Sequence, residues 1–181
     1  MIDPIQILKN DHEKLRSMLE SIDTRTPDQR DSLLDDIERE LKIHTQLEEE
    51  ILYPAFREAA ENAEDRKMYF EATEEHHVAD MVLPELKVIS SDTDRFVARA
   101  KVFTELIQHH IEEEEEELLP RAQKLLAERM PEIGTRMAER RLELEKEWSS
   151  TIGRAAHKLK STAEKFMPAS AKDREDEARP R

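Results

Sequence analysis

Two segments of this 181-residue chain repeat a pattern of residues that bind metals. HTQLEEEILYP, which begins at His44, and HIEEEEEELLP, which begins at His110, are identical at six of eleven positions. Both read H-x3-E-x5-P. Residues four apart share one face of a helix, so His44 and Glu48 can reach the same metal ion. His110 and Glu114 form the second pair of this kind.

Two further histidines extend the pattern to a repeat of half the molecule. His12 lies 32 residues before His44, and His76 lies 34 residues before His110. A lone histidine is usually an ordinary surface or core residue, but six of the seven histidines here fall in four clusters, one for each expected helix. Imidazoles and carboxylates without thiolates suit iron, manganese, zinc or copper. Six such groups exceed the needs of one tetrahedral zinc ion and predict two ions, with the glutamates able to bridge them. The predicted ligands are His12, His44, Glu48, His76, His110 and Glu114.

Two histidine pairs leave a choice of ligand. Adjacent residues point about 100° apart on a helix, so only one member of each pair can face the site. The alignment of the two halves favours His76 over His77. The H-x3-E-x5-P register favours His110 over His109.

The elements that position these residues are predicted to be helices. Apolar residues recur at helical spacing, and the helix-start signals Asp3-Pro4 and Thr26-Pro27 precede two of the segments. We expect helices over about 5–22, 27–61, 65–90 and 95–129. Short connections favour an all-α, up-down-up-down four-helix bundle. Pro54, Pro84 and Pro120 should kink or end their helices, since proline removes a backbone hydrogen bond.

A further helix is expected after the bundle, because Pro131 and Gly134 interrupt the pattern. We predict a domain over residues 1–130, a C-terminal amphipathic helix over 131–168 and a polar, disordered tail over 169–181. Apolar residues from Trp148 to Phe166 recur beside many basic ones. Such a helix can bind an acidic membrane surface or a protein partner. Packing on the acidic bundle, or pairing with its copy in a homodimer, is the simpler interpretation and is favoured.

Composition excludes several other classes of protein. The chain has no cysteine, so disulfides, thiol catalysis and iron–sulfur clusters are excluded. With two glycines it has no Gly-rich loop for binding nucleotide phosphates. The net charge of -14 argues against nucleic-acid binding, which requires a surplus of basic residues. Neither an apolar run long enough to span a membrane nor a signal peptide is evident, so a cytoplasmic location is expected.

Taken together, these motifs resemble the hemerythrin-like, HHE cation-binding domain family over about residues 5–129. The matching motifs are His12 in NDHEKL, His44 and Glu48 in HTQLEEEILYP, His76 in EEHHVADMVLPEL, and His110 and Glu114 in HIEEEEEELLP. The resemblance implies a four-helix bundle that holds a non-haem centre of two Fe ions. Related domains carry oxygen, sense oxygen, iron or redox state, or handle nitric oxide and peroxide.

The chain departs from the oxygen carriers of this family on the third helix. Those proteins have H-x3-H there, whereas here Asp80 follows four residues after His76. Either Asp80 is a substitute ligand, or one iron lacks a protein ligand and takes water. An open position favours reaction with peroxide or nitric oxide over reversible storage of dioxygen. We therefore expect a role in redox or oxygen sensing or stress response, and leave open whether the protein turns over a substrate.

Other functions remain as alternatives. A ferritin-like di-iron bundle has two E-x-x-H motifs, and this chain has only one, from Glu74 to His77. A zinc protease requires H-E-x-x-H, which is absent. The main alternative is a metal-independent helical module that acts through the basic C-terminal helix.

Overall fold

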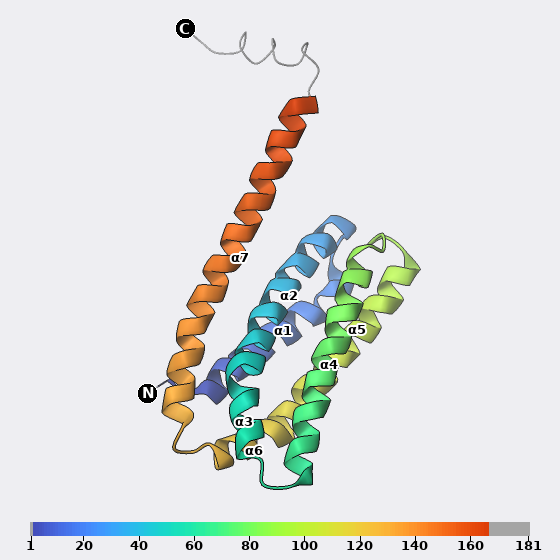
Figure 1. The fold of residues 1–181 in the computed structure, drawn as a ribbon. Coiled ribbons are helices and arrows are strands. Elements are labelled where there is room, and N and C mark those ends of the chain that lie inside the picture. The colour runs from blue at the N-terminus through green and yellow to red at the C-terminus, as the bar shows by residue number, and fades with distance from the viewer. Residues whose placement is uncertain (1, 167–181) are drawn as a thin grey trace. The chain divides into compact units, whose positions relative to one another are not determined.

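The computed structural model describes the backbone of residues 2–166 and the side chains of residues 2–151, and this part of the chain contains no strand. Four long helices lie side by side and alternate in direction (Figure 1). They are α1 (Pro4–Glu20), α2 (Pro27–Leu47), α4 (Ala63–Lys87) and α5 (Asp94–Glu113). A further long helix, α7 (Met130–Phe166), follows. The predicted fold class, an all-α four-helix bundle with an additional C-terminal helix, is confirmed.

The chain divides into two compact units, residues 1–142 and 143–181, and the bundle lies within the first. The expected boundaries at 130 and 168 stay a prediction. The basic side chains of the amphipathic C-terminal helix lie outside the described side chains. The tail over 169–181 lies outside the described residues. None of the helices described has the length and apolar character needed to cross a bilayer.

Polar side chains begin the bundle helices by binding free backbone N–H groups. Asp3 accepts a hydrogen bond from the Ile5 amide at 3.0 Å, and Thr93 accepts one from the Phe96 amide at 3.2 Å. These contacts satisfy donors that have no partner inside the helix. They fix where α1 and α5 start, and so fix the register of every residue that follows.

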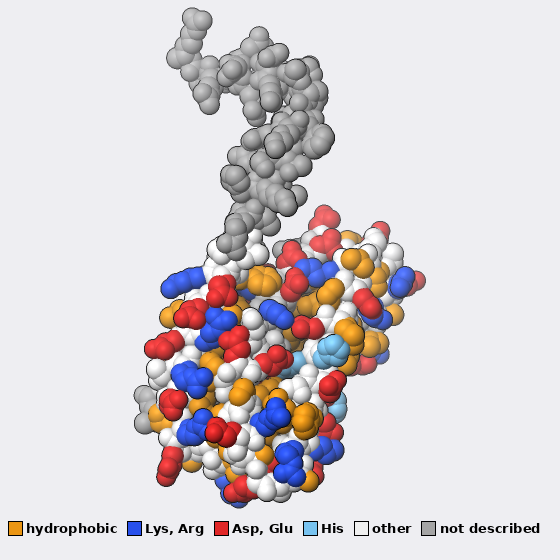
Figure 2. Space-filling model, in the orientation of Figure 1, with side chains coloured by type: hydrophobic (Ala, Val, Ile, Leu, Met, Phe, Trp, Pro, Cys, Tyr) orange, Lys and Arg blue, Asp and Glu red, His pale blue; other side chains and the backbone are white. Residues whose placement is uncertain are grey.

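An apolar core fills the part of the bundle near the α1–α2 and α4–α5 connections. Side chains from all four long helices meet there, and charged side chains are spread over the outside among exposed apolar ones (Figure 2). Burial of these side chains from water is the main stabilising contribution to the bundle. The core residues are Leu15, Leu19, Ile22, Leu34, Ile37, Leu41, Ala79, Leu83, Leu86, Phe96, Ala100, Phe103, Ile107 and Ile111.

The second and fourth bundle helices each contain a widened π-helical turn that the sequence analysis did not predict. The turn η2 (Glu48–Leu52) joins α2 to α3 (Tyr53–Ala59), and η3 (Glu114–Leu118) joins α5 to α6 (Leu119–Leu125). The Tyr53 amide donates to the Glu48 carbonyl, five residues earlier, and the amide of Leu119 donates equivalently to Glu114. In both cases the residue after this donor is a proline, Pro54 or Pro120.

The π turns correct the expectation that Pro54 and Pro120 would simply kink or end their helices. Proline has no N–H to donate and its ring crowds the carbonyl four residues earlier. A wider turn accommodates both effects while the chain stays helical. The helices nevertheless end at Ala59 and Leu125, earlier than expected. α4, by contrast, passes through Pro84 and ends at Lys87.

An ion pair joins the short helix α6 to the start of α4 at one end of the bundle. Arg121 on α6 donates to Asp65 at the start of α4 through Nε, at 2.7 Å, and through Nη2, at 2.9 Å. Asp65 is buried and also accepts from the Glu61 amide at 2.9 Å. The contact therefore holds α6 against the turn between α3 and α4.

Gly134, near the start of α7, is in close contact with the N-terminal segment. A Cβ atom at this position would lie 2.2 Å from the backbone oxygen of Ile2 and 3.1 Å from Cδ of Pro4. Only glycine allows this approach of the two backbones.

Candidate metal centre

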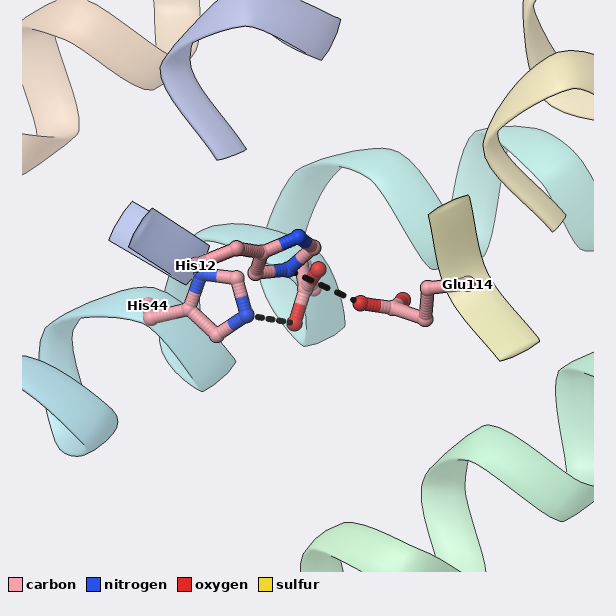
Figure 3. Close-up of side chains that lie close together, drawn as sticks. His12, His44 and Glu114 are labelled. Carbon is pink, nitrogen blue, oxygen red and sulfur yellow. Dashed lines mark ion pairs between the residues drawn. The ribbon is translucent and has the colours of Figure 1, made fainter. Parts of the chain in front are cut away.

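The six residues predicted as ligands lie together inside the bundle. His12 comes from α1, His76 from α4, and the two His–Glu pairs from the ends of α2 and α5 where the π turns begin. Each is at most 4% exposed. Figure 3 shows His12, His44 and Glu114 pointing toward one another. The structure thus brings the six side chains together, while their role as ligands remains a prediction.

The Nε2 atoms of the four imidazoles point into this cluster. His12 Nε2 lies 3.3 Å from Glu114 Oε2, and the Nε2 of His76 lies 3.4 Å from Glu48 Oε2. His44 Nε2 is 3.2 Å from Oε2 of its own partner, Glu48. Each glutamate therefore contacts histidines of both halves of the bundle.

Two groups of atoms within the cluster could each hold one ion. His12, His44, Glu48 and Glu114 form one group, and their ligand atoms all lie within 4.8 Å of one another. Glu48 recurs in the second group, with the imidazoles of His76 and His110. The second group has three protein atoms where the first has four, so it is the more open of the two.

The Nδ1 atoms point away from the cluster, and each meets a carboxylate. His12 binds Glu115, His76 binds Glu49 and His110 binds Glu75, each at 2.8 Å, and His44 binds Asp11 at 3.4 Å. An ionised carboxylate can only accept, so each Nδ1 carries a proton, and in the neutral imidazole the lone pair on Nε2 then points inward. Histidines that bind metals are held in this way.

Several inward-facing atoms have no hydrogen-bond partner although they are buried. They include Nε2 of His12 and His44, both oxygens of Glu48, and Oε2 of Glu114. His76 Nε2 and His110 Nε2 lie 3.1 Å apart, and when both Nδ1 atoms carry the proton of a neutral imidazole neither Nε2 can donate to the other. Buried polar atoms without partners are destabilising. Cations held by the two groups would give these atoms partners, so the residues present fit a metal.

The pKa values in the cluster reflect burial and mutual charge. Burial and the neighbouring Glu114 raise the pKa of Glu48 well above its ordinary value. Burial also acts to raise the pKa of Glu114, but the nearby histidines His110 and His12 outweigh it and hold that pKa low. Burial lowers the pKa of His44 to about 4, so this imidazole is neutral at pH 7 and has a free lone pair.

Tyr53 reaches the cluster from α3, directly after the first π turn. Its hydroxyl donates to Glu114 Oε1 at 2.6 Å and lies 3.5 Å from His76 Nε2. The ring is fully buried and stacks on His76, with 5.5 Å between ring centroids. Burial and the negative charge of Glu114 raise the pKa of Tyr53, which keeps the hydroxyl protonated. It is therefore a hydrogen-bond donor beside the more open group.

The residues that sequence left ambiguous lie at the surface. His77 is exposed, and so is His109, which pairs with Glu113. Asp80 has an exposed carboxylate that binds Lys42 at 3.3 Å. His76 and His110 are thus the members of the two histidine pairs that face the site, and Asp80 does not.

The carboxylates behind the imidazoles were largely missed from sequence. Asp11 and Glu75 were not singled out, while for Glu49 and Glu115 a role in orienting the imidazoles was considered but exposure at the surface was favoured. Each of the four stands next to a predicted ligand in the sequence. That adjacency is a signal, although it does not reveal which histidine each carboxylate binds.

Comparisons with known proteins bear on this site. The family model described as Hemerythrin HHE cation binding domain matches residues 3–122. A crystal structure of a Hemerythrin HHE cation binding domain-containing protein from Mycobacterium kansasii superposes with a TM-score of 0.70 and 23% identity. The match covers 88% of this chain and 93% of that protein, and at this identity it shows a shared fold. No significant match is found among curated proteins.

Proposed function

Since this chain belongs to the hemerythrin HHE cation-binding family, we propose that its buried cluster holds two iron ions and binds or reacts with small oxidants. Dioxygen, peroxide and nitric oxide are the ligands of interest. We further propose a role in redox or oxygen sensing or in stress response, in the cytoplasm. The bundle over residues 1–130 carries this function.

The observation that carries the proposal is the pattern of unpartnered atoms. Nε2 of His12 and His44, both oxygens of Glu48 and one oxygen of Glu114 are buried without a hydrogen-bond partner, and a carboxylate binds the outer nitrogen of each of the four imidazoles. Nitrogen and oxygen donors of this kind suit iron, and also manganese or zinc. When bound, two ferrous ions supply two electrons to an oxidant.

The residues of this chain have separate tasks around such a centre. The four outer carboxylates hold the imidazoles in one tautomer and orientation. Tyr53 keeps its proton and donates it in a hydrogen bond to Glu114. That bond restrains one oxygen of the glutamate and leaves the other, Oε2, directed at the cluster.

A small ligand has a short route to the more open group. A surface cavity of about 370 Å³ is lined by Tyr53, together with Glu49 and His77. The ring of Tyr53 also stacks on His76, so the cavity lies one side chain away from the more open group. This arrangement favours reaction at the side of His76 and His110.

The first experiment is elemental analysis of protein reconstituted anaerobically with ferrous iron. We expect about two irons per chain, since two groups of ligand atoms are present. The double variant His44→Ala, His110→Ala should lose most of this iron, while His77→Ala, His109→Ala keeps it. Circular dichroism establishes that both variants fold. Iron content that is unchanged in the first variant would contradict the assignment.

A second measurement addresses reactivity. Addition of peroxide to the reduced, iron-loaded protein should change its near-ultraviolet absorption spectrum. A spectrum that does not respond to peroxide, dioxygen or nitric oxide would exclude the proposed reaction with oxidants while leaving the metal site intact. Failure to bind any metal would instead favour the metal-independent helical module, which acts through the basic C-terminal helix on a partner or a membrane surface.

A further inference from the structure

We propose that a groove between α4 and the α5–η3 segment is the route by which a divalent transition-metal cation reaches the buried cluster, with Glu75, His109 and Glu113 as a transient binding site at its surface. This inference rests on the proposed function, because it names the path by which that site is filled.

The groove is strongly acidic. It has a volume of about 220 Å³ and is lined by six glutamates and one lysine. The lysine, Lys67, pairs with Glu71 at 3.2 Å and cancels one of these charges. A surplus of carboxylates in a concave surface raises the local concentration of cations and repels anions. The glutamates are Glu64, Glu71, Glu75, Glu113, Glu114 and Glu117.

The inner end of the groove is a buried acceptor of the cluster itself. Glu114 lines the groove, although its side chain is only 2% exposed. Its Oε2 has no hydrogen-bond partner. This atom is independent of the surface acids, and it belongs to the group formed with His12 and His44. A cation that moves along the groove therefore ends at an oxygen that already lacks a partner.

Glu75 and Glu113, which line the groove, form with the neighbouring His109 an outer group that has the donor types of a weak transition-metal site. Ligand atoms of Glu75, His109 and Glu113 lie within 4.8 Å of one another. His109 Nε2 lies 3.3 Å from Glu113 Oε1, and both side chains are about half exposed. One imidazole with two carboxylates suits a first-row divalent cation. Exposure to water keeps binding weak, which suits transfer rather than storage.

Glu75 connects the two ends. Its Oε2 accepts a hydrogen bond from His110 Nδ1 at 2.8 Å, while the residue also belongs to the outer group. His110 Nε2 faces Glu114 Oε2 at 3.5 Å on the other side of the ring. A cation held at Glu75 is thus one side chain away from the buried cluster. The cavity beside Tyr53 is lined by two acids, Glu49 and Asp80, and is therefore less acidic than the groove.

The test is the rate of metal loading. Metal-free protein is mixed anaerobically with ferrous ion, and the ferrous ion still free is measured with a coloured chelator over time. The groove variant is Glu71→Gln, Glu113→Gln, Glu117→Gln, none of which contacts a predicted ligand in the described structure. The control is Asp31→Asn, Asp36→Asn, Glu20→Gln, which removes the same charge from exposed positions on α1 and α2.

We expect the groove variant to load about tenfold more slowly at low ionic strength and to reach the same final iron content. The control should load at nearly the rate of the unmodified protein. Added salt should reduce the difference, because it screens exposed charges. His109→Gln alone should slow loading by about threefold, in proportion to its single contact with the cation.

Equal rates for the groove variant and the control would overturn the proposed route. If the unmodified protein still binds iron in that case, the proposed function stands and only the route is wrong. If the unmodified protein takes up no iron at all, the proposed function fails and this inference fails with it. The two failures are therefore distinguished by the final iron content of the unmodified protein.

Discussion

Glu49 Oε1 lies 2.8 Å from Nδ1 of His76, although the two residues belong to different halves of the bundle. The same relation holds between Glu115 and His12, also at 2.8 Å. The hydrogen bond from His76 lowers the pKa of Glu49. Burial acts to raise the pKa of Glu115, but hydrogen bonds from His12 and Arg16 outweigh it and lower that pKa. Each lone histidine is thus oriented by a carboxylate from the opposite half.

Loss of either carboxylate should weaken metal binding without removing a ligand. We expect Glu49→Ala and Glu115→Ala each to reduce affinity for ferrous ion by about 10- to 100-fold. The Gln variants should lose less, because the amide oxygen still accepts from Nδ1. Competition with a chelator of known affinity measures the change. The control is Glu112→Ala. Glu112 is an exposed glutamate in the same run as Glu115, and this variant should bind ferrous ion as tightly as the unmodified protein does.

Tyr53→Phe should separate metal binding from reactivity. Removal of the hydroxyl takes away the hydrogen bond to Glu114 but leaves all six predicted ligands in place. We expect normal iron content and a several-fold change in the rate of the spectral response to peroxide. Stability should fall by about 1 kcal/mol, since a buried acceptor loses its donor. Tyr69→Phe, one ring farther out, is the matched control, and an equal effect there would count against this role of Tyr53.

Deletion of Glu116 tests whether the bundle depends on the π turn. A π turn holds one residue more than an α-helical turn, so the deletion would convert η3 into ordinary α-helix and leave the following segment in register. Leu119 and Ala122, which are fully buried, would then stay in the core. We expect a loss of no more than about 1–3 kcal/mol in the free energy of unfolding, measured by denaturant titration. Iron binding should fall, because Glu114 and Glu115 lie in the turn that tightens. Glu116→Ala keeps the π turn and should change stability and iron binding little. A deletion that abolishes folding would show that the packing of α6 requires the extra residue.

Asp65→Asn should destabilise the protein in a pH-dependent manner. The hydrogen bonds from Arg121 are the main reason that the pKa of Asp65 is lowered from 3.8 to about 2. A lowered pKa in the folded state contributes stability above pH 3.8, and this contribution is lost as the pH falls through 3.8 toward 2. At pH 7 the variant should be less stable by on the order of 1 kcal/mol, after allowance for solvent screening.

Denaturant titrations of the Asn variant and the unmodified protein between pH 7 and pH 3 measure this difference. It should be constant from pH 7 to about pH 5 and shrink below pH 4. Asp28→Asn, a first-turn acid outside this ion pair, serves as the comparison. A difference that grows on acidification has the wrong sign and would disprove the argument.

Gly134→Ala has two opposing effects on stability: a gain in helix propensity and a clash with the backbone of Ile2. Alanine favours an α-helix by about 1 kcal/mol over glycine. Its Cβ atom would lie 2.2 Å from the oxygen of Ile2, however, and relief of such a clash typically costs about 1–3 kcal/mol. We expect a net loss of stability in thermal unfolding. In a chain that lacks Met1 and Ile2 the same substitution should be neutral or stabilising, and destabilisation there would show that another contact is responsible.

The sequence predicted the main features of the fold because two signals agreed. Helical spacing of apolar residues and the start signals at Pro4 and Pro27 indicated the bundle helices. The π turns were not predicted, because Pro54 and Pro120 report only that an N–H is missing. A helix can end, bend or form a wider turn at a proline. Which of these occurs depends on packing against neighbouring helices, and that packing cannot be read from the sequence.

For the candidate site, the inward-facing residues were predicted from sequence, but the hydrogen bonds between helices were not. The repeat of H-x3-E selected His44 and His110, and the structure places both with the other predicted ligands. The outer carboxylates could not be assigned, since each bond joins residues on different helices. The six consecutive glutamates from Glu112 look alike in sequence. In the fold one faces the cluster, one binds His12 and one pairs with His109.

The crossed pairing of the two halves has a consequence for how such a protein can arise. Each helical hairpin carries a lone histidine, an H-x3-E pair, a π turn and a proline. It does not complete its own centre, because the lone histidine meets the glutamates of the other hairpin. A single hairpin would have to dimerise with a copy of itself to assemble all six groups. Duplication and fusion of such a hairpin would convert an obligate symmetric dimer into one chain. The two copies could then diverge. The two groups of ligand atoms in this chain are indeed unequal, with four residues in one and three in the other.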